Sequence, residues 1–191
     1  MNNCAIILAS QNEKIINSNK PKAMCEILFE PVICRVISAV QTAGIEDICI
    51  VSDSSLIEKH FTDSNIRIFR AIENTVDFVN QHNNVLVING SLLFADAKTL
   101  VAAINYHIEN DNDITSVTVD EKTPDGKYAE IIRASVFSAN NIPESEFCYY
   151  NTDNDRFFTA PDTFRELNET NETLRLEMLE KIIDSGVDIP C

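Results

Sequence analysis

Short apolar runs alternate with amphipathic stretches along the first 120 residues of the chain. Runs rich in β-branched residues predict strands at 4–9, 47–52, 66–70, 85–89 and 114–120. Between them, residues 31–43 and 96–110 carry apolar side chains every three or four positions, the spacing of a helix with one buried face. Because strands and helices alternate and the strands are continuously apolar, the pattern predicts an α/β domain whose mostly parallel sheet has helices on both faces.

The C-terminal part of the chain has a different pattern. Residues 141–155 are polar, around a short β-prone run at 147–150. Thr163 and Glu166 then form the capping-box pattern that begins a helix, and Gly186 follows its predicted end near residue 184. We therefore divide the chain into an α/β domain, residues 1–160, and a C-terminal linker helix, residues 161–191.

The predicted linker helix carries more apolar side chains than the edge of a small sheet can cover. They recur at steps of three and four residues: Phe164, Leu167, Leu174, Met178, Leu179, Ile182 and Ile183. A helix of about 20 residues spans roughly 30 Å. We expect its first half to pack on the domain and its second half to project or to pair with another copy of the chain. The alternative is a helix folded back wholly onto its own domain.

Composition and charge limit the classes of partner. The 191 residues include 30 Asp and Glu against 15 Lys and Arg, which gives a formal net charge of −15. Nucleic acids and anionic membranes need a basic surface, so neither is expected as a partner. The sequence shows no membrane-span run and no signal-peptide pattern, and its six cysteines have no C-x-x-C spacing. These features favour the reducing cytoplasm.

The carboxyl edge of the predicted sheet is where open α/β sheets bind ligands. The loop at 10–24 follows the first strand, and Asn89, Gly90 and Ser91 follow the fourth, so both belong to this edge. A loop that cradles phosphate needs glycine, since only glycine lets the backbone approach phosphate oxygens closely. Residues 10–14 are Ser-Gln-Asn-Glu-Lys, without a glycine. The position suits a nucleotide site, whereas the residue types do not.

Several segments, in order along the chain, resemble the sugar-1-phosphate nucleotidyltransferases. The closest resemblance is to the N-terminal uridyltransferase domain of the bifunctional N-acetylglucosamine-1-phosphate uridyltransferase/glucosamine-1-phosphate acetyltransferases. The segments are LA at 8–9, PKAM at 21–24, AGIEDI at 43–48, VLVINGSLLFADAKTL at 85–100, TPDGKYAEIIR at 123–133 and the stretch 160–189. The resemblance implies a Rossmann-like nucleotide-diphospho-sugar transferase fold, Mg²⁺-dependent uridylyl transfer from UTP to a sugar 1-phosphate, and a role in peptidoglycan precursor biosynthesis.

The resemblance also implies roles for particular residues. Lys22, in the retained Pro-Lys element, is the surviving candidate for a catalytic cation that binds phosphate. The family's nucleotide-binding positions fall on Leu8, Ala9, Ser10, Gln11, Thr75 and Gly90, and its two metal positions fall on Ser91 and Asp162.

Departures from the family pattern fall on this chemistry. The two loop glycines of the family correspond to Gln11 and Glu13, and the loop arginine that neutralises the transferring phosphate corresponds to Ile15. A carboxylate at Glu13 repels phosphate unless a cation intervenes. The metal aspartate corresponds to Ser91, a neutral hydroxyl that is a poor Mg²⁺ ligand. The metal asparagine corresponds to Asp162, which can either ligate a metal or cap the following helix.

A further departure is a shortened sugar-binding segment. The family has an excursion that covers the sugar phosphate, and between Arg133 and Ala134 this chain lacks it. The sequence therefore favours a UDP-N-acetylglucosamine pyrophosphorylase-like domain with a degenerate active site. We expect it to bind UTP or a UDP-sugar weakly, to bind Mg²⁺ weakly or not at all, and to have weakened or lost uridylyl transfer.

Two alternatives stay open. One is a non-catalytic interaction or regulatory domain attached to an acetyltransferase β-helix, which the linker-like ending of the chain suggests. The other is a transferase whose catalysis lies outside these 191 residues. Hexapeptide repeats beyond residue 191 would settle the second of these alternatives.

Overall fold

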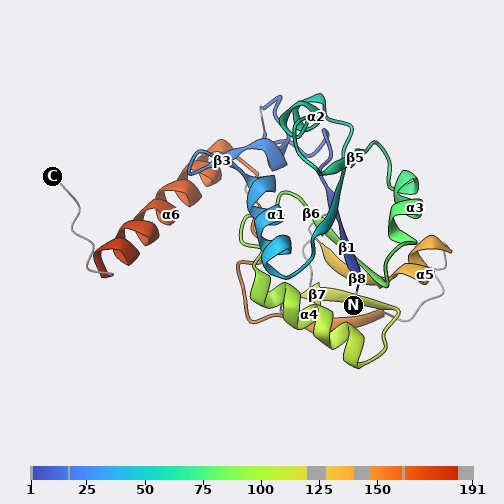
Figure 1. Ribbon diagram of the computed structural model, residues 1–191. Coiled ribbons are helices and arrows are strands. Elements are labelled where there is room, and N and C mark those ends of the chain that lie inside the picture. The colour runs from blue at the N-terminus through green and yellow to red at the C-terminus, as the bar shows by residue number, and fades with distance from the viewer. Residues whose placement is uncertain (1, 17, 120–127, 140–146, 161, 185–191) are drawn as a thin grey trace.

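A seven-stranded sheet with helices on both faces forms the body of the molecule (Figure 1). The computed structural model describes residues 2–16, 18–119, 128–139, 147–160 and 162–184, without the side chains of 164, 179 and 182–184. The strand order is β5-β4-β1-β6-β8-β7-β9. The strands are β1 (Asn3–Leu8), β4 (Asp47–Val51), β5 (Arg67–Phe69), β6 (Asn84–Asn89), β7 (Ile114–Thr118), β8 (Ala129–Arg133) and β9 (Phe147–Asn151).

The sheet is mostly parallel, which confirms the predicted fold class. β1 pairs in parallel with β4 and β6, β4 pairs in parallel with β5, and β7 pairs in parallel with β9. β8 is antiparallel to both of its neighbours, β6 and β7. The sequence pattern predicted every strand of this sheet except β8. β1 lies between two parallel neighbours, so the loop after it begins at the carboxyl edge, as predicted.

Alternate residues of β1 supply two separate cores. Ala5 and Ile7 are fully buried on the face that is covered by α1 (Val32–Thr42) and α4 (Ala97–Glu109). Cys4 and Ile6 are fully buried on the opposite face, with apolar residues of α3 (Val76–Val79) and α5 (Ala134–Ser138). Because every second side chain of a strand points to the same face, a strand covered on both sides must be apolar throughout.

The predicted helices at 31–43 and 96–110 are α1 and α4. Pro31 and Asp96 are their N-caps, and the Asp96 carboxylate accepts a hydrogen bond from the Thr99 N–H at 2.8 Å. The short elements were not predicted: α2 (Ser55–His60), α3, α5, the 3₁₀ turns η1 (Lys22–Met24) and η2 (Ile72–Thr75), and the hairpin of β2 (Glu26–Ile27) and β3 (Glu30–Pro31).

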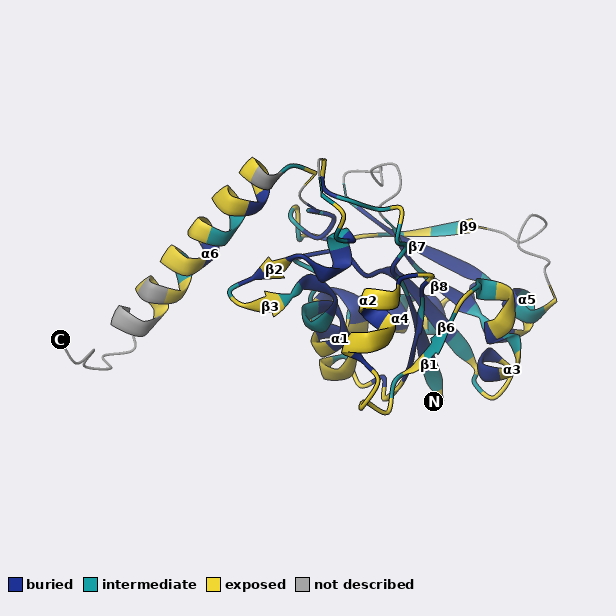
Figure 2. Cartoon of the chain, turned by 90° about the horizontal axis from the view of Figure 1, so that it is seen from above, coloured by how far each residue is buried: buried dark blue, intermediate teal, exposed yellow. Residues whose placement is uncertain are grey.

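The C-terminal helix α6 (Phe164–Asp184) begins with the predicted capping box, in which the Glu166 N–H donates to the Thr163 hydroxyl at 3.2 Å. Leu167 and Leu174 are buried against the domain. The far half of the helix stands away from the domain (Figure 2), and Leu176 and Met178 are 52% and 50% exposed there. The helix is therefore not folded back wholly onto the domain.

The predicted pairing of this helix with a second copy remains a prediction. Two residues of the predicted stripe, Leu179 and Ile183, have side chains outside the described part of the chain.

Candidate functional site at the carboxyl edge of the sheet

The ends of β1, β4 and β6 meet at one edge, where the sequence places the candidate site. Ala9 donates its N–H to the Val51 carbonyl at 3.0 Å, and Gly90 donates to the Leu8 carbonyl at 2.7 Å. A Cβ at Gly90 would lie 3.0 Å from Ile7 Cγ2 and 3.1 Å from the Leu8 oxygen. Glycine at this position therefore lets the loop after β6 cross close to β1.

The loop after β1 closes without glycine because its conformation does not require one. The Glu13 N–H donates to the Ser10 carbonyl at 3.3 Å, and the Asn12 N–H donates to the Ser10 hydroxyl at 3.1 Å. Among the described residues of the loop, none has a positive φ. The Gln11 N–H donates to Asp53 Oδ1 at 2.8 Å, so a carboxylate of the chain faces the turn where the family holds phosphate.

Ile15, at the position of the family's arginine, is part of an apolar cluster. Its side chain is 2% exposed. The cluster contains Ile15, Cys25, Ile27, Val32, Leu93, Leu167 and Leu174. The last two belong to α6, so the side chain that replaces the arginine helps to hold the C-terminal helix on the domain. A guanidinium in the same place would be buried without a partner.

Glu13 points towards the residues that follow β6. Both of its carboxylate oxygens lie 3.4 Å from Asn89 Nδ2, and one lies 3.4 Å from the Ser91 hydroxyl. The Ser91 hydroxyl also donates to Asn89 Oδ1 at 2.6 Å. Burial, with added repulsion from Glu13 and Glu130, raises the pKa of Tyr128 to about 12. Glu13, in the loop after β1, thus places a carboxylate beside Ser91, the position where the family has its metal-binding aspartate.

Lys22 is held between Glu13 and the start of α6. Its N–H donates to the Glu13 carbonyl at 2.7 Å. Its ammonium forms an ion pair with the Asp162 carboxylate, and the two side chains are 18% and 54% exposed. The Ile16 N–H donates to the Asp162 carbonyl at 3.0 Å, which fixes Asp162 beside the loop. The helix is capped by Thr163 and Glu166, so the Asp162 side chain serves Lys22 instead.

The structure brings together most of the residues singled out in the sequence. Leu8, Ala9, Ser10, Gln11, Lys22, Gly90, Ser91 and Asp162 lie at or beside the carboxyl edge. Thr75 is different: it ends η2, its side chain is fully buried, and its hydroxyl donates to the Ile72 carbonyl at 2.7 Å. Its hydroxyl is therefore bound locally.

Sequence reasoning missed Asp53 and Tyr128 as residues of this edge. Asp53 directly follows Ser52, at the end of the predicted strand 47–52, so the same edge rule that selected Ser91 could have selected it. Tyr128 lies within a segment that resembles the family, and the Asn89 N–H donates to its carbonyl at 3.1 Å. Because the antiparallel strand β8, which follows Tyr128, was not predicted, no rule placed Tyr128 at this edge.

No group of three His, Cys, Asp or Glu side chains in the described part of the chain is close enough to hold a metal ion. β8 runs directly into α5, with Arg133 as the N-cap of that helix, so the sugar-binding excursion is missing at this point.

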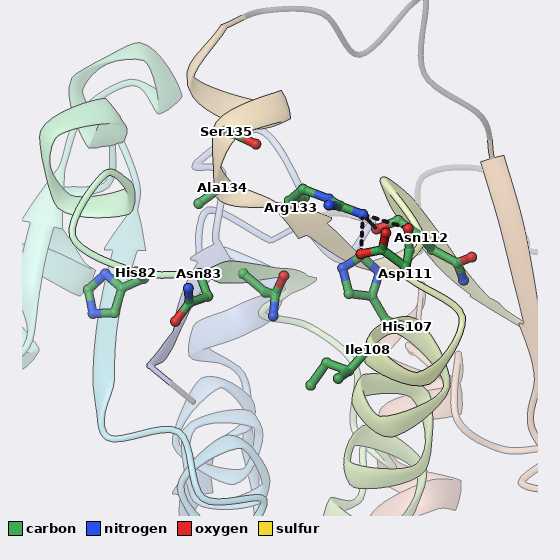
Figure 3. A pocket seen from close by; sticks show the side chains of 10 residues that line it. His82, Asn83, His107, Ile108, Asp111, Asn112, Arg133, Ala134 and Ser135 are labelled. Atoms are coloured by element: carbon green, nitrogen blue, oxygen red, sulfur yellow. Dashed lines mark hydrogen bonds and ion pairs between the residues drawn. The ribbon is translucent and has the colours of Figure 1, made fainter.

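The opposite, amino edge of the sheet contains a cavity of about 460 Å³ (Figure 3). Its lining residues are His82, Asn83, Asn84, His107, Ile108, Asp111, Asn112, Arg133, Ala134 and Ser135. Arg133 donates to the carbonyls of Asp111 and Asn112 at the end of α4, at 2.5 and 3.1 Å. None of the residues predicted for the site lines this cavity.

Comparisons with known proteins identify relatives in sequence and in structure. No protein-family model matches the chain. The bifunctional protein GlmU of Thermosipho africanus is 28% identical over 137 residues, covering 67% of this chain and 30% of that protein. The GlmU of Clostridium tetani is 24% identical over 160 residues, covering 78% and 35%. The chain thus spans about a third of the length of these relatives.

A structural neighbour shows the fold. A cytidylyltransferase from Leptospira borgpetersenii superposes with a TM-score of 0.71 at 10% identity, covering 100% of both chains. No helix in the described residues is long and apolar enough to cross a membrane. The chain has the fold of this cytidylyltransferase, and its sequence is similar to the N-terminal region of GlmU, which supports the resemblance to the sugar-1-phosphate nucleotidyltransferases.

Proposed function

We propose that this chain is a UDP-N-acetylglucosamine pyrophosphorylase-like domain whose uridylyl transfer is weakened or lost. The observation that supports this most directly is the burial of Ile15, at 2% exposed, in the cluster that anchors α6. Phosphoryl transfer needs positive charge at the transferring phosphate, since the charge on its oxygens must be stabilised in the transition state. An apolar, inward-facing side chain supplies none.

We also propose that Mg²⁺ binds weakly or not at all. Mg²⁺ takes oxygen ligands in octahedral geometry and prefers at least one carboxylate. At the family's two metal positions, Ser91 offers a neutral hydroxyl that donates to Asn89, and Asp162 is neutralised by Lys22. These residues fit the ion poorly, so no step of a reaction is derived through it.

The remaining nucleotide chemistry rests on Lys22 and on the backbone of residues 8–11. These groups support weak binding of UTP or a UDP-sugar by one cation and by the Gln11 N–H once Asp53 has moved away from it. Glu13 and Asp53 add negative charge beside them, which opposes polyphosphate.

Isothermal titration calorimetry with UTP and Mg²⁺ tests this proposal. We expect no binding at micromolar UTP and no pyrophosphate release with N-acetylglucosamine 1-phosphate as acceptor. Lys22→Ala should remove any residual binding, and Lys98→Ala, which removes an exposed lysine elsewhere, is the matched control. Micromolar affinity for UTP in the unchanged chain would contradict the proposal.

The second candidate is an interaction or regulatory domain attached to an acetyltransferase β-helix, and the projecting half of α6 favours it. Leu176 and Met178 are about half exposed, and Phe29, at the tip of the β2–β3 hairpin, is 98% exposed. Asn171 of α6 accepts the Leu28 N–H at 3.1 Å, so helix and hairpin are joined. We propose that a second copy of the chain pairs through this part.

Light scattering tests the pairing. The double substitution Leu176→Glu and Met178→Glu should convert an associated form to a monomer while the circular dichroism spectrum stays unchanged. Leu56→Glu, at an exposed apolar residue of α2, is the control and should leave the association state as it was. A monomer before and after the double substitution, at all concentrations measured, rejects self-association.

A further inference from the structure

Two groups at the carboxyl edge can bind an anion, and each already faces a carboxylate of the same chain. The Gln11 N–H donates to Asp53 Oδ1 at 2.8 Å. The Lys22 ammonium pairs with the Asp162 carboxylate. Asp53 follows β4 and Asp162 precedes α6, so the two acids come from different segments and converge on the same loop.

Both carboxylates can leave these positions without exposing a buried charge. Asp53 is exposed, and the Asp162 side chain is 54% exposed, whereas Lys22 is 18% exposed. Water can solvate either acid once it has moved, whereas the largely buried Lys22 ammonium then needs another anion. A ligand that offers more negative charge than one carboxylate can therefore replace them.

Asp162 is the stronger of the two competitors because the backbone fixes it near Lys22. Its carbonyl accepts the Ile16 N–H at 3.0 Å, and its own N–H donates to Glu166 Oε2 at 2.8 Å. A tethered carboxylate has a high effective concentration at its partner, so a free anion must compete with it.

We propose that Asp162, assisted by Asp53, is an internal occupant of an anion site on this loop, and that the site takes a polyphosphate only when Asp162 leaves Lys22. This inference deepens the proposed function and rests on it, since it names what regulates the same nucleotide site. The ligand class is a di- or triphosphate group, because an ammonium and a backbone N–H from the two ends of one loop suit successive phosphoryl groups better than a single carboxylate.

Calorimetry with inorganic pyrophosphate, in buffer without divalent cations, tests the internal occupant. Asp162→Asn should raise the affinity by about five- to tenfold, the effect of losing one competing ion pair. Asp153→Asn is the matched control, because Asp153 also pairs with a lysine, Lys98, at 3.1 Å, but both side chains are about 80% exposed and neither belongs to the loop. It removes the same charge and should change the affinity less than about twofold.

Equal gains for Asp162→Asn and Asp153→Asn would overturn the inference, since the effect would then be one of net charge. Adding Lys22→Met to Asp162→Asn should abolish the gain, and a gain that persists also overturns it. UTP separates the two proposals. A pyrophosphate gain in a variant that shows no UTP binding at any concentration leaves the internal occupant standing and rejects the nucleotide site. UTP binding without a gain in pyrophosphate affinity rejects the internal occupant and leaves the nucleotide site standing.

Discussion

The two edges of the sheet both gather polar side chains, but they satisfy them differently. At the carboxyl edge, the loop pairs with side-chain carboxylates: Lys22 with Asp162, and the Gln11 N–H with Asp53. At the amino edge, Arg133 donates to the backbone carbonyls of Asp111 and Asn112, just after α4 (Figure 3). It also pairs with Asp111 and Asp113.

We interpret the difference as one between a structural polar cluster and a candidate site for a ligand. Asn112 is buried, so a ligand that displaced Arg133 would have to replace its bond to the Asn112 carbonyl. A solvated carboxylate can leave its partner with little loss. The amino edge has a cavity of about 460 Å³, yet its polar groups hold the fold together, so the size of a cavity does not identify the functional edge.

The largest effect that we expect is a loss of stability when Ile15, the buried apolar side chain of the loop after β1, is replaced. Ile15→Arg, which restores the residue type of the family, should destabilise the fold by at least about 3 kcal/mol, because it places a charge in a buried apolar cluster. The free energy of unfolding in urea measures this. The neighbouring Ile16 is 60% exposed, so Ile16→Arg should change stability by less than about 0.5 kcal/mol. Equally small effects at both positions would show that Ile15 does not anchor the loop.

The second prediction concerns acid pH at the amino edge. His107 is 2% exposed, and its Nδ1 lies 3.0 Å from the Thr115 hydroxyl. Burial, and then the nearby Arg133, lower the pKa of His107 to about 4, against the opposite influence of Asp113 and Asp111.

Unfolded chains take up this proton near pH 6.5, whereas the folded protein takes it up near pH 4. The folded state therefore binds fewer protons in this interval, and its stability falls as the pH drops from about 6.5 to 4, by at most about 3 kcal/mol. Urea unfolding at several pH values should show this slope in the unchanged chain and a smaller one in His107→Gln. Identical slopes would assign the acid sensitivity to other groups.

Much of the fold could be predicted because burial decides it. The strands 4–9 and 85–89 and the helices α1 and α4 have long apolar runs or stripes that the core requires. β8 was missed, since five residues with Glu130 in the middle give no clear period and its antiparallel pairs are distant in sequence. α3 and α5, with four and five residues, are too short for a helical period to show.

The site was predictable in its place and not in its contacts. The edge rule and the family resemblance located the loop and Lys22, and the missing glycines predict that its chemistry differs from that of the family. The partners are 42 residues apart for Gln11 and Asp53, 76 for Asn89 and Glu13, and 140 for Lys22 and Asp162. Spacing in the sequence carries no information about such pairs, which depend on where the folded loop points each side chain.

The third prediction tests whether the amino-edge cluster is structural. Arg133→Met should cost about 2 kcal/mol, because the carbonyls of Asp111 and Asn112, just after α4, lose a charged donor. Arg165→Met is the control: Arg165 is 84% exposed in its side chain and has one partner within α6, Glu169 at 3.6 Å. It should change the free energy of unfolding by less than about 0.5 kcal/mol.

The smallest effect on stability that we expect from a charged residue of either edge is that of Lys22. Lys22→Met keeps the length of the side chain and removes its ion pair with Asp162, so the free energy of unfolding should fall by less than about 1 kcal/mol. Pyrophosphate binding in the Asp162→Asn background should disappear with the same substitution. Measuring the free energies of unfolding of Lys22→Met and Arg133→Met side by side compares the two edges directly. If Lys22→Met cost as much as Arg133→Met, the Lys22–Asp162 pair would be holding α6 in place, and the carboxyl edge would be as structural as the amino edge.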